Sequence, residues 1–180
     1  PLAEAVRAAA AQSGPERRVT VPFLGGPYLV DFEARAITAP PGHRPAGFQK
    51  GLVLLAYLAR AQDIGRSGRM VAARELNGGD MFFQGPHALL TQPVTARFGA
   101  DPAGFVARAG ALGLTPDQAG AGTAVRGPVL PHLEVGLILH PGDEEFPAEL
   151  TYTFDAYAHY HLPLDAIWSL INVLAEELAA

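Results

Sequence analysis

The sequence predicts an α+β fold, with a mostly antiparallel sheet built from β-hairpins and covered by helices in a single domain. Stretches in which apolar and polar residues alternate come in adjacent pairs joined by turn residues, which is the pattern of hairpins. Helical stretches lie between or after these pairs. No strand–helix–strand alternation with a phosphate-binding glycine loop is present, which argues against a parallel α/β sheet.

The N-terminal half predicts a helix, a group of short strands and a second helix. Gly25-Gly26-Pro27 separates two alternating stretches and predicts the turn of a hairpin. Ser13-Gly14-Pro15 is a helix stop. We expect these elements in order: helix 2–12, strands 18–23, 28–32 and 34–39, and helix 46–61.

The C-terminal half predicts a second hairpin and a long final helix. The two strands of this hairpin alternate regularly on both sides of a connection at residues 141–147. The final helix has one apolar stripe, which includes Trp168. We expect Trp168, Met81 and the phenylalanines to be core residues. We expect these elements in order: strand 70–75, helix 86–98 kinked or split at Pro93, helix 102–112, loop 115–122, strands 133–139 and 150–154, and helix 163–178.

The composition limits the classes of partner. The 180 residues carry a net charge of −5 without a large basic cluster, so we expect no nucleic-acid partner. The longest apolar run, residues 51–59, is too short to cross a bilayer, so we expect no membrane partner. The absence of cysteine excludes disulfides and thiolate metal sites and fits a reducing cytoplasm, which is the expected location. Residues 16–180 form the expected domain, and residues 1–15 an N-terminal helix or arm.

Four stretches occur in an order that resembles a known family. They are RELNGGDMFFQGPHALLTQP (74–93), RFG (97–99), LPHLEVGLILHPGDEEFPAE (130–149) and TFDAYAHYHLPLDAIWSL (153–170). Together they resemble a bacterial and archaeal family described as domain of unknown function 3786, over roughly residues 50–178. The resemblance implies no activity. Some members of that family are joined to a cysteine-rich iron–sulfur segment, whereas this chain has no cysteine.

The first candidate site is the acidic connection of the C-terminal hairpin, at residues 143–145. Acids at a turn are usually a solvated tip. The alternative requires Phe146 and Pro147 to hold the connection against the body, so that a carboxylate could bind a cation or act as a general base. On that alternative Asp143 is a catalytic candidate, and Glu145 and Phe146 are ligand-binding candidates.

The second candidate site is the His-Tyr-His segment at residues 159–161. On extended backbone His159 and His161 would face one side and could share a metal, whereas on a helix they would diverge by about 200°. Asp155 could orient one of these histidines. His159 and Asp155 are therefore catalytic candidates, and Asp155, His159 and His161 are candidate ligands of a divalent metal. The alternative is an ordinary surface loop that leads into the last helix.

The third candidate site combines Arg74 and Glu75 with the glycines after them and with His87. Gly85-Pro86 could place His87 near a helix N-terminus, where backbone amides bind anions. Arg74, Glu75 and His87 are therefore ligand-binding candidates. The alternative is ordinary turn chemistry with an Arg–Glu pair.

These observations predict a cytoplasmic domain that binds a small molecule or cofactor in a pocket between the sheet and the helices. We expect polar residues at the mouth of this pocket, namely His87, Asp143, Asp155, His159 and His161. The alternative is an enzyme of the hydrolase or lyase type that uses an Asp/His pair, with or without a divalent metal. Six histidines also leave room for a haem-like cofactor.

Overall fold

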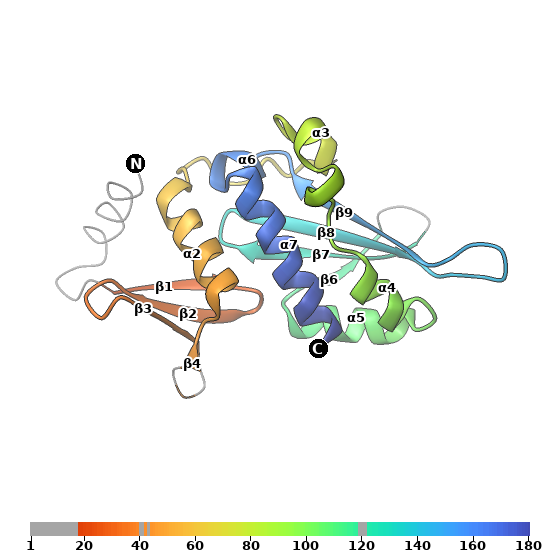
Figure 1. The fold of residues 1–180 in the computed structure, drawn as a ribbon, viewed down its shortest axis with the longest axis horizontal. Coiled ribbons are helices and arrows are strands. Elements are labelled where there is room, and N and C mark those ends of the chain that lie inside the picture. The colour runs from red at the N-terminus through yellow and green to blue at the C-terminus, as the bar shows by residue number, and fades with distance from the viewer. Residues whose placement is uncertain (1–17, 40–41, 43, 119–121) are drawn as a thin grey trace.

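The computed structural model describes residues 18–39, 42, 44–118 and 122–180 (Figure 1). The predicted helix at residues 2–12 and the predicted arm at residues 1–15 lie outside the described part of the chain. The described residues form two antiparallel sheets and several helices, so the predicted α+β class is confirmed.

The first sheet has four strands in the order β1-β2-β3-β4. It contains the predicted N-terminal hairpin, in which Val19 pairs with Val30 and Val30 pairs with Ile37. Alternation places Val21, Phe23, Tyr28 and Val30 on the buried face. Its strands are β1 (Arg18–Phe23), β2 (Gly26–Asp31), β3 (Ala36–Ala39) and β4 (Arg44–Pro45).

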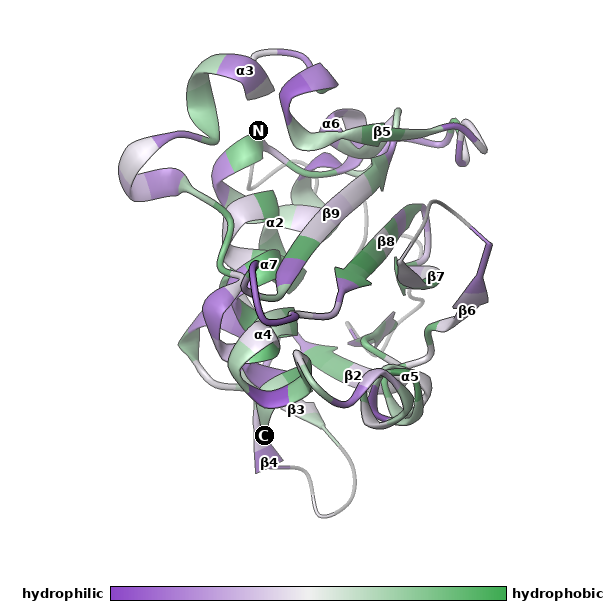
Figure 2. Cartoon of the chain, turned by 90° about the vertical axis from the view of Figure 1, so that its right-hand side faces the viewer, coloured by the Kyte–Doolittle hydropathy of each residue, from purple (hydrophilic) through white to green (hydrophobic). Residues whose placement is uncertain are grey.

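The second sheet has five strands in the order β5-β9-β8-β7-β6. The predicted C-terminal hairpin is confirmed as β8 and β9, with Val135 opposite Phe154 and His140 opposite Glu149. In Figure 2 strand β8 is drawn mostly in green, because one of its faces consists of Leu133, Val135, Leu137 and Leu139 and the other also contains Ile138. The strands are β5 (Met70–Ala72), β6 (Thr115–Asp117), β7 (Thr123–Leu130), β8 (Leu133–His140) and β9 (Glu149–Asp155).

The turn between β1 and β2 joins the two sheets. Leu24 and Gly25 both have positive φ angles, 48° and 76°, as a two-residue hairpin turn of the mirror-image type requires. The Leu24 amide donates to the carbonyl of Val129 on β7, at 3.1 Å. Gly25 lies so close to the backbone of Leu112 that an added Cβ would be 2.8 Å from its carbonyl carbon.

Helix α7 (Leu164–Ala179) lies between α2 (Phe48–Arg60) and α4 (Gln92–Phe98) and crosses the five-stranded sheet (Figure 1). Its stripe of Ile167, Leu170, Ile171 and Leu174 is fully buried. Helix α5 (Pro102–Ala111) packs against β7 and begins as predicted, because Asp101 accepts a hydrogen bond from the amide of Gly104 at 2.9 Å. The short helices are η2 (Ala73–Glu75), α3 (Gly79–Phe82), η3 (Gly85–His87) and α6 (Ala158–His161).

Several local predictions are wrong. The predicted loop 115–122 contains β6, and β7 was not predicted. The predicted strand 70–75 ends at Ala72, where η2 begins. The predicted helix 86–98 is split into the turn η3 and helix α4, but the break lies before Pro93, which is in the first turn of α4.

Some predicted core residues lie at the surface instead. Met81, Phe48 and Phe146 are 83%, 85% and 67% exposed. Trp168 is only half-buried, and its indole N–H donates to the carbonyl of Ala88 at 3.3 Å. Within the described residues, none of the helices combines the length and apolar character needed to cross a bilayer.

Candidate functional site

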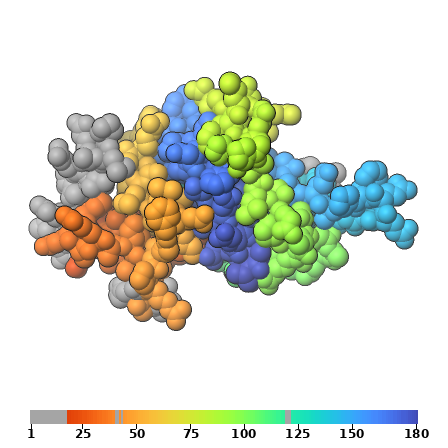
Figure 3. Space-filling view, viewed as in Figure 1, coloured from red at the N-terminus to blue at the C-terminus, as the bar shows by residue number. Residues whose placement is uncertain are grey.

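The acidic connection between β8 and β9 projects from the body of the molecule (Figures 1 and 3). One oxygen of Asp143 accepts hydrogen bonds from the amides of Glu145 and Phe146, at 2.8 and 2.7 Å. The bond from the Phe146 amide, followed by that from Glu145, lowers the pKa of Asp143. Phe146 is exposed and does not hold the connection against the body, which was the condition for an inward-pointing carboxylate. The geometry is that of a solvated turn.

The hairpin also separates Asp143 from the other predicted catalytic residues. Strand β9 begins at Glu149, beside the acidic connection, and ends at Asp155. At 3.3–3.4 Å per residue these ends are about 20 Å apart. The expectation that Asp143 meets Asp155 and the His-Tyr-His segment at one end of the hairpin is therefore wrong, because the strand carries the two groups to opposite ends.

Asp155 is fully buried and binds backbone amides. Its carboxylate accepts hydrogen bonds from the amides of Ser67, Gly68 and Tyr157, at 2.9, 2.8 and 2.9 Å. Burial alone would raise the pKa of Asp155, but these hydrogen bonds outweigh burial and the pKa is lowered. Asp155 thus anchors the loop before β5, and the predicted hydrogen bond to a histidine is not among its contacts.

The His-Tyr-His segment is helical, so its two histidines diverge. His161 is fully buried, with Nε2 at 2.9 Å from the carbonyl oxygen of Gly65 and its ring stacked on His132 at 5.4 Å. His159 packs against Tyr160, and its Nδ1 is buried without a hydrogen-bond partner among the described atoms. Burial lowers the pKa of both His159 and His161.

The predicted metal ligands Asp155, His159 and His161 do not form a ligand set. In the part of the chain that the structure describes, no group of three or more histidines and carboxylates is arranged to hold a metal ion. The helical backbone turns His159 away from His161, and backbone amides occupy Asp155.

The residues of the third candidate site, Arg74, Glu75 and His87, have separate structural roles. Glu75 accepts a hydrogen bond from the Ala72 amide at 2.8 Å and so fixes the end of β5. Arg74 is exposed and lines an open cleft of about 720 Å³ against β9. His87 ends a three-residue turn, so it does not begin a helix as predicted, and it stacks on Phe82 at 4.5 Å and meets Trp168 edge-on at 5.8 Å.

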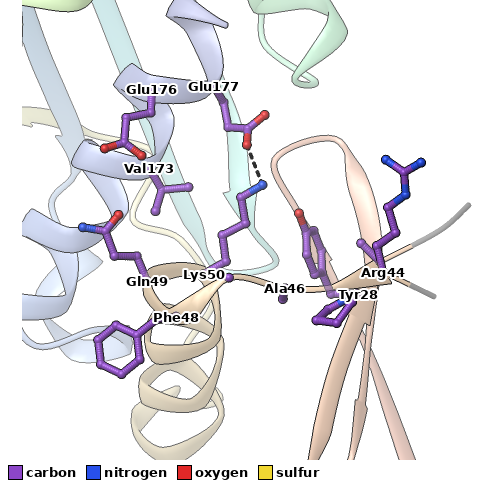
Figure 4. A pocket seen from close by; sticks show the side chains of 12 residues that line it. Tyr28, Arg44, Ala46, Phe48, Gln49, Lys50, Val173, Glu176 and Glu177 are labelled. Atoms are coloured by element: carbon purple, nitrogen blue, oxygen red, sulfur yellow. Dashed lines mark hydrogen bonds and ion pairs between the residues drawn. The ribbon is translucent and has the colours of Figure 1, made fainter. Parts of the chain in front are cut away.

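A different pocket lies between the four-stranded sheet and helices α2 and α7 (Figure 4). Its volume is about 610 Å³, within the range of small-molecule sites. The sheet, the start of α2 and the end of α7 each contribute part of its wall. The lining residues are Tyr28, Ala39, Arg44, Pro45, Ala46, Gly47, Phe48, Gln49, Lys50, Val173, Glu176 and Glu177.

The N-terminus of α2 opens into this pocket without a cap. The first helical hydrogen bond runs from the Gly51 amide to the carbonyl of Gly47, at 3.0 Å. Gly47 has no side chain to accept from the next amides, and no acidic residue lies in the first turn. The amides of Phe48, Gln49 and Lys50 are therefore left without helical acceptors. A free helix N-terminus carries a partial positive charge and attracts anions.

Two cationic side chains flank this helix end. Lys50 reaches across the pocket to Glu177 on α7, with Nζ at 2.5 Å from the carboxylate (Figure 4). Burial lowers the pKa of Lys50, but the hydrogen bond to Glu177 and the nearby Tyr28 outweigh it, so the pKa lies above its ordinary value. Lys50 is therefore a fixed cation. Arg44 on β4 is exposed and forms no ion pair with any described residue.

This pocket was not predicted from the sequence. A local signal was nevertheless present, because Gly47 precedes an apolar helix whose third residue is Lys50, where stable helix starts favour acids. No local pattern indicates that Tyr28 and Glu177 line the same pocket, since both lie far from residues 44–50 in the sequence.

The sequence profile of one family matches residues 1–177 of the 180-residue chain, and its description is Domain of unknown function (DUF3786). This match is longer than the expected 50–178 and includes the N-terminal segment. A search of curated proteins and a search of solved structures found no match. The chain therefore belongs to the DUF3786 family.

Proposed function

We propose that this protein binds a small anionic molecule, with a carboxylate or phosphate group, in the pocket between the four-stranded sheet and helices α2 and α7. One observation carries the proposal: the uncapped N-terminus of α2 opens into a pocket of about 610 Å³ that also contains Lys50 and Arg44. Three amides without helical acceptors are complementary to an anion, and Arg44, which has no ion-pair partner among the described residues, adds a positive charge to the lining of the same pocket.

The charges on the far wall limit where the anionic group can lie. Lys50 and Glu177 neutralise each other, whereas Glu176 is exposed and has no ion-pair partner among the described residues. An anion would be repelled by Glu176, so we place it on the α2 side, between Lys50 and Arg44. The remainder of the ligand would extend toward Val173 and Glu176, where an amino or hydroxyl group fits best.

Among the described residues, the Asp/His pair that the enzyme alternative requires is not formed by Asp155 and His161. An Asp/His pair needs a carboxylate in contact with an imidazole. The oxygens of Asp155 accept hydrogen bonds from backbone amides, and the His161 ring contacts the carbonyl oxygen of Gly65. We therefore propose binding alone.

Titration with inorganic phosphate, followed by a panel of phosphate-bearing and carboxylate-bearing metabolites, tests this proposal. Isothermal calorimetry on the intact chain should show saturable binding, and Arg44→Gln should weaken it roughly tenfold, or about 1.4 kcal/mol. Arg60→Gln is the matched control, because Arg60 is an exposed arginine at the other end of the same helix. Absence of binding by every probe, or equal losses in the two variants, would contradict the proposed site.

A further inference from the structure

Strand β9 has a free edge over the half of its length that starts at Glu149. Strand β5 pairs only with residues 153–155 of β9, at the end near Asp155 (Figure 2). After Ala72 the chain leaves the sheet and forms η2. Among the described strands, residues 149–152 therefore have β8 on one side and no strand on the other, over about 13 Å at 3.3 Å per residue.

A hydrogen bond at the end of the β5–β9 pair shows which backbone groups of β9 face the open side. The amide of Ala156 donates to the carbonyl of Arg69, at 2.9 Å. In an antiparallel pair every second residue turns both its N–H and its C=O toward the same neighbour. Two residues before Ala156, Phe154 therefore faces β5, and the next two in this series, Tyr152 and Leu150, face the open edge. The amide of Tyr152 and both backbone groups of Leu150 have no hydrogen-bond partner on this side among the described residues.

The other edges of the five-stranded sheet are protected against pairing with another chain. On β5 the outer amide of Ala72 donates to Glu75, at 2.8 Å. At the opposite edge of the sheet, β6 has only three residues, and one of them is Pro116. Short edge strands and prolines are common ways to prevent strand addition. Residues 149–152 contain neither lysine nor proline, so this edge remains available to a further strand.

The free edge borders the open cleft of about 720 Å³ against β9. Leu150 and Tyr152 line one wall, and the segment that follows α3 lines the other. This segment contributes Phe83 and Leu89, which pack against the core and are only partly buried. The Tyr152 hydroxyl donates to the carbonyl of Leu90, at 2.7 Å, and so fixes the segment beside the strand. The cleft thus combines apolar side chains with unpaired backbone groups.

We propose that this edge binds an extended segment of a partner protein, which joins the sheet as an added strand in line with β5. Backbone groups that alternate along a strand edge are complementary to another extended chain, and pockets for alternate side chains provide specificity. The added strand would run antiparallel to β9, as β5 does.

The side chains of β9 define the sequence pattern of the partner segment. Residues that are directly opposite in a sheet lie on the same face. The partner residues opposite Tyr152 and Leu150 face the apolar cleft and are therefore apolar, whereas the residue between them lies opposite the exposed Thr151 and is polar. The residue opposite Glu149 is basic, because Glu149 is exposed and has no ion-pair partner among the described residues. The pattern along the partner segment is apolar, polar, apolar, basic.

The shape of the site favours a partner segment over a second copy of this chain. The free edge lies inside a cleft, between β9 and the segment that follows α3. In a second copy the same edge would lie in the same concave surroundings, and two concave surfaces do not fit together. A single extended segment can enter the cleft.

Short peptides with this pattern test the proposal on the full chain. The panel has Val, Ile or Leu at the apolar positions, Thr at the polar position and Lys at the basic position. An NMR titration should give saturable shifts at the amides of Leu150 and Tyr152, and these amides should exchange with solvent roughly tenfold more slowly in the complex. Replacement of the peptide lysine by glutamate should weaken binding.

Methylation of the peptide backbone provides a matched control. The amides of the two apolar peptide residues point toward β9, so N-methylation of both should weaken binding roughly tenfold or more. The amide of the polar residue points to solvent, so its N-methylation should leave binding nearly unchanged.

A pair of protein variants locates the binding site. Ala88 is exposed and lines the cleft, so Ala88→Trp should fill it and abolish peptide binding. Ala96→Trp is the control, because Ala96 is exposed on α4 and does not line the cleft. Absence of binding by the whole panel, equal losses with the two N-methylated peptides, or equal binding by the two variants would overturn the proposal. Self-association of the chain through the amides of Leu150 and Tyr152 would also overturn it, in favour of a second copy.

Discussion

Asp155 illustrates how much burial changes the role of one residue. A carboxylate at a strand end near two histidines suggests catalysis or metal binding when only the sequence is known. In the fold the same carboxylate is fully buried and receives three backbone amides from two loops. The sequence predicts that Asp155 lies at the end of a strand. It does not predict that the amides of Ser67 and Gly68 are its partners, because these residues precede Asp155 by more than 80 positions in the chain.

We predict that Asp155→Asn destabilises the protein by about 1–3 kcal/mol at neutral pH, because the charge-assisted hydrogen bonds are weakened. The folded pKa of Asp155 is lowered, so its stabilising contribution is present above the unfolded pKa of about 3.9 and is lost as the pH falls through the folded value. The difference between native protein and variant should therefore shrink below about pH 4. Urea denaturation at several pH values measures this difference.

Asp143→Asn is the control for that measurement. Asp143 also accepts two amides and also has a lowered pKa, but it lies on the exposed tip of the hairpin. We expect it to change stability far less than Asp155→Asn does. Equal effects of the two substitutions would show that burial does not set the importance of these carboxylates.

The exposure of Phe146 determines whether the neighbouring acids at residues 143–145 can face the body of the molecule. The sequence predicts a turn around residues 141–147, and that prediction is confirmed. Whether the acids face inward depends on whether Phe146 packs against the body, and the strand twist and length that determine this are properties of the whole sheet. The direction of a side chain at a hairpin tip could not be obtained from the sequence.

At the scale of elements, regular periodicity gave the reliable predictions. Strands β8 and β9 and helix α7 have unbroken periods of two and 3.6 residues, and all three were predicted within a few residues. Strand β7 was missed because Gly127-Pro128 interrupts its pattern, which usually argues against a strand. Pro128 is accommodated beside an irregularity in the pairing with β8.

The turn between β1 and β2 is the element whose alteration should be most damaging. We predict that Gly25→Ala destabilises the protein by about 2 kcal/mol or more, because the φ of 76° is unfavourable for alanine and the new Cβ would be 2.8 Å from the backbone of Leu112. Chemical denaturation measures this loss. Gly26→Ala is the adjacent control, since a Cβ there meets no atom within 4 Å. Similar losses in the two variants would mean that the contact with Leu112 is unimportant.

At the scale of the whole molecule, the candidate pocket depends on three distant segments. Tyr28 comes from the first sheet, residues 44–50 from β4 and the start of α2, and residues 173–177 from the end of α7. The sequence predicts a pocket between a sheet and helices, with His87, Asp143, Asp155, His159 and His161 at its mouth, and none of these residues lines the pocket. The actual wall forms only when α2 packs against α7, and periodicity does not reveal which helices become neighbours.

The central claim is that the free amides at the start of α2 bind an anion, and Gly47→Asp tests it most directly. A Cβ at Gly47 meets no atom within 4 Å, so an aspartate there can cap the helix. The cap should stabilise the protein by a few tenths of a kcal/mol and at the same time fill the proposed anion site. Gly47→Ala is the control, because it adds the Cβ without the carboxylate.

The measurement is an NMR titration of the backbone amides with inorganic phosphate. The native protein and Gly47→Ala should show saturable shifts at Phe48, Gln49 and Lys50, and Gly47→Asp should show none while unfolding at a slightly higher temperature. Phosphate binding by Gly47→Asp that is as tight as in Gly47→Ala, or an absence of saturable shifts in the native protein, would contradict the claim.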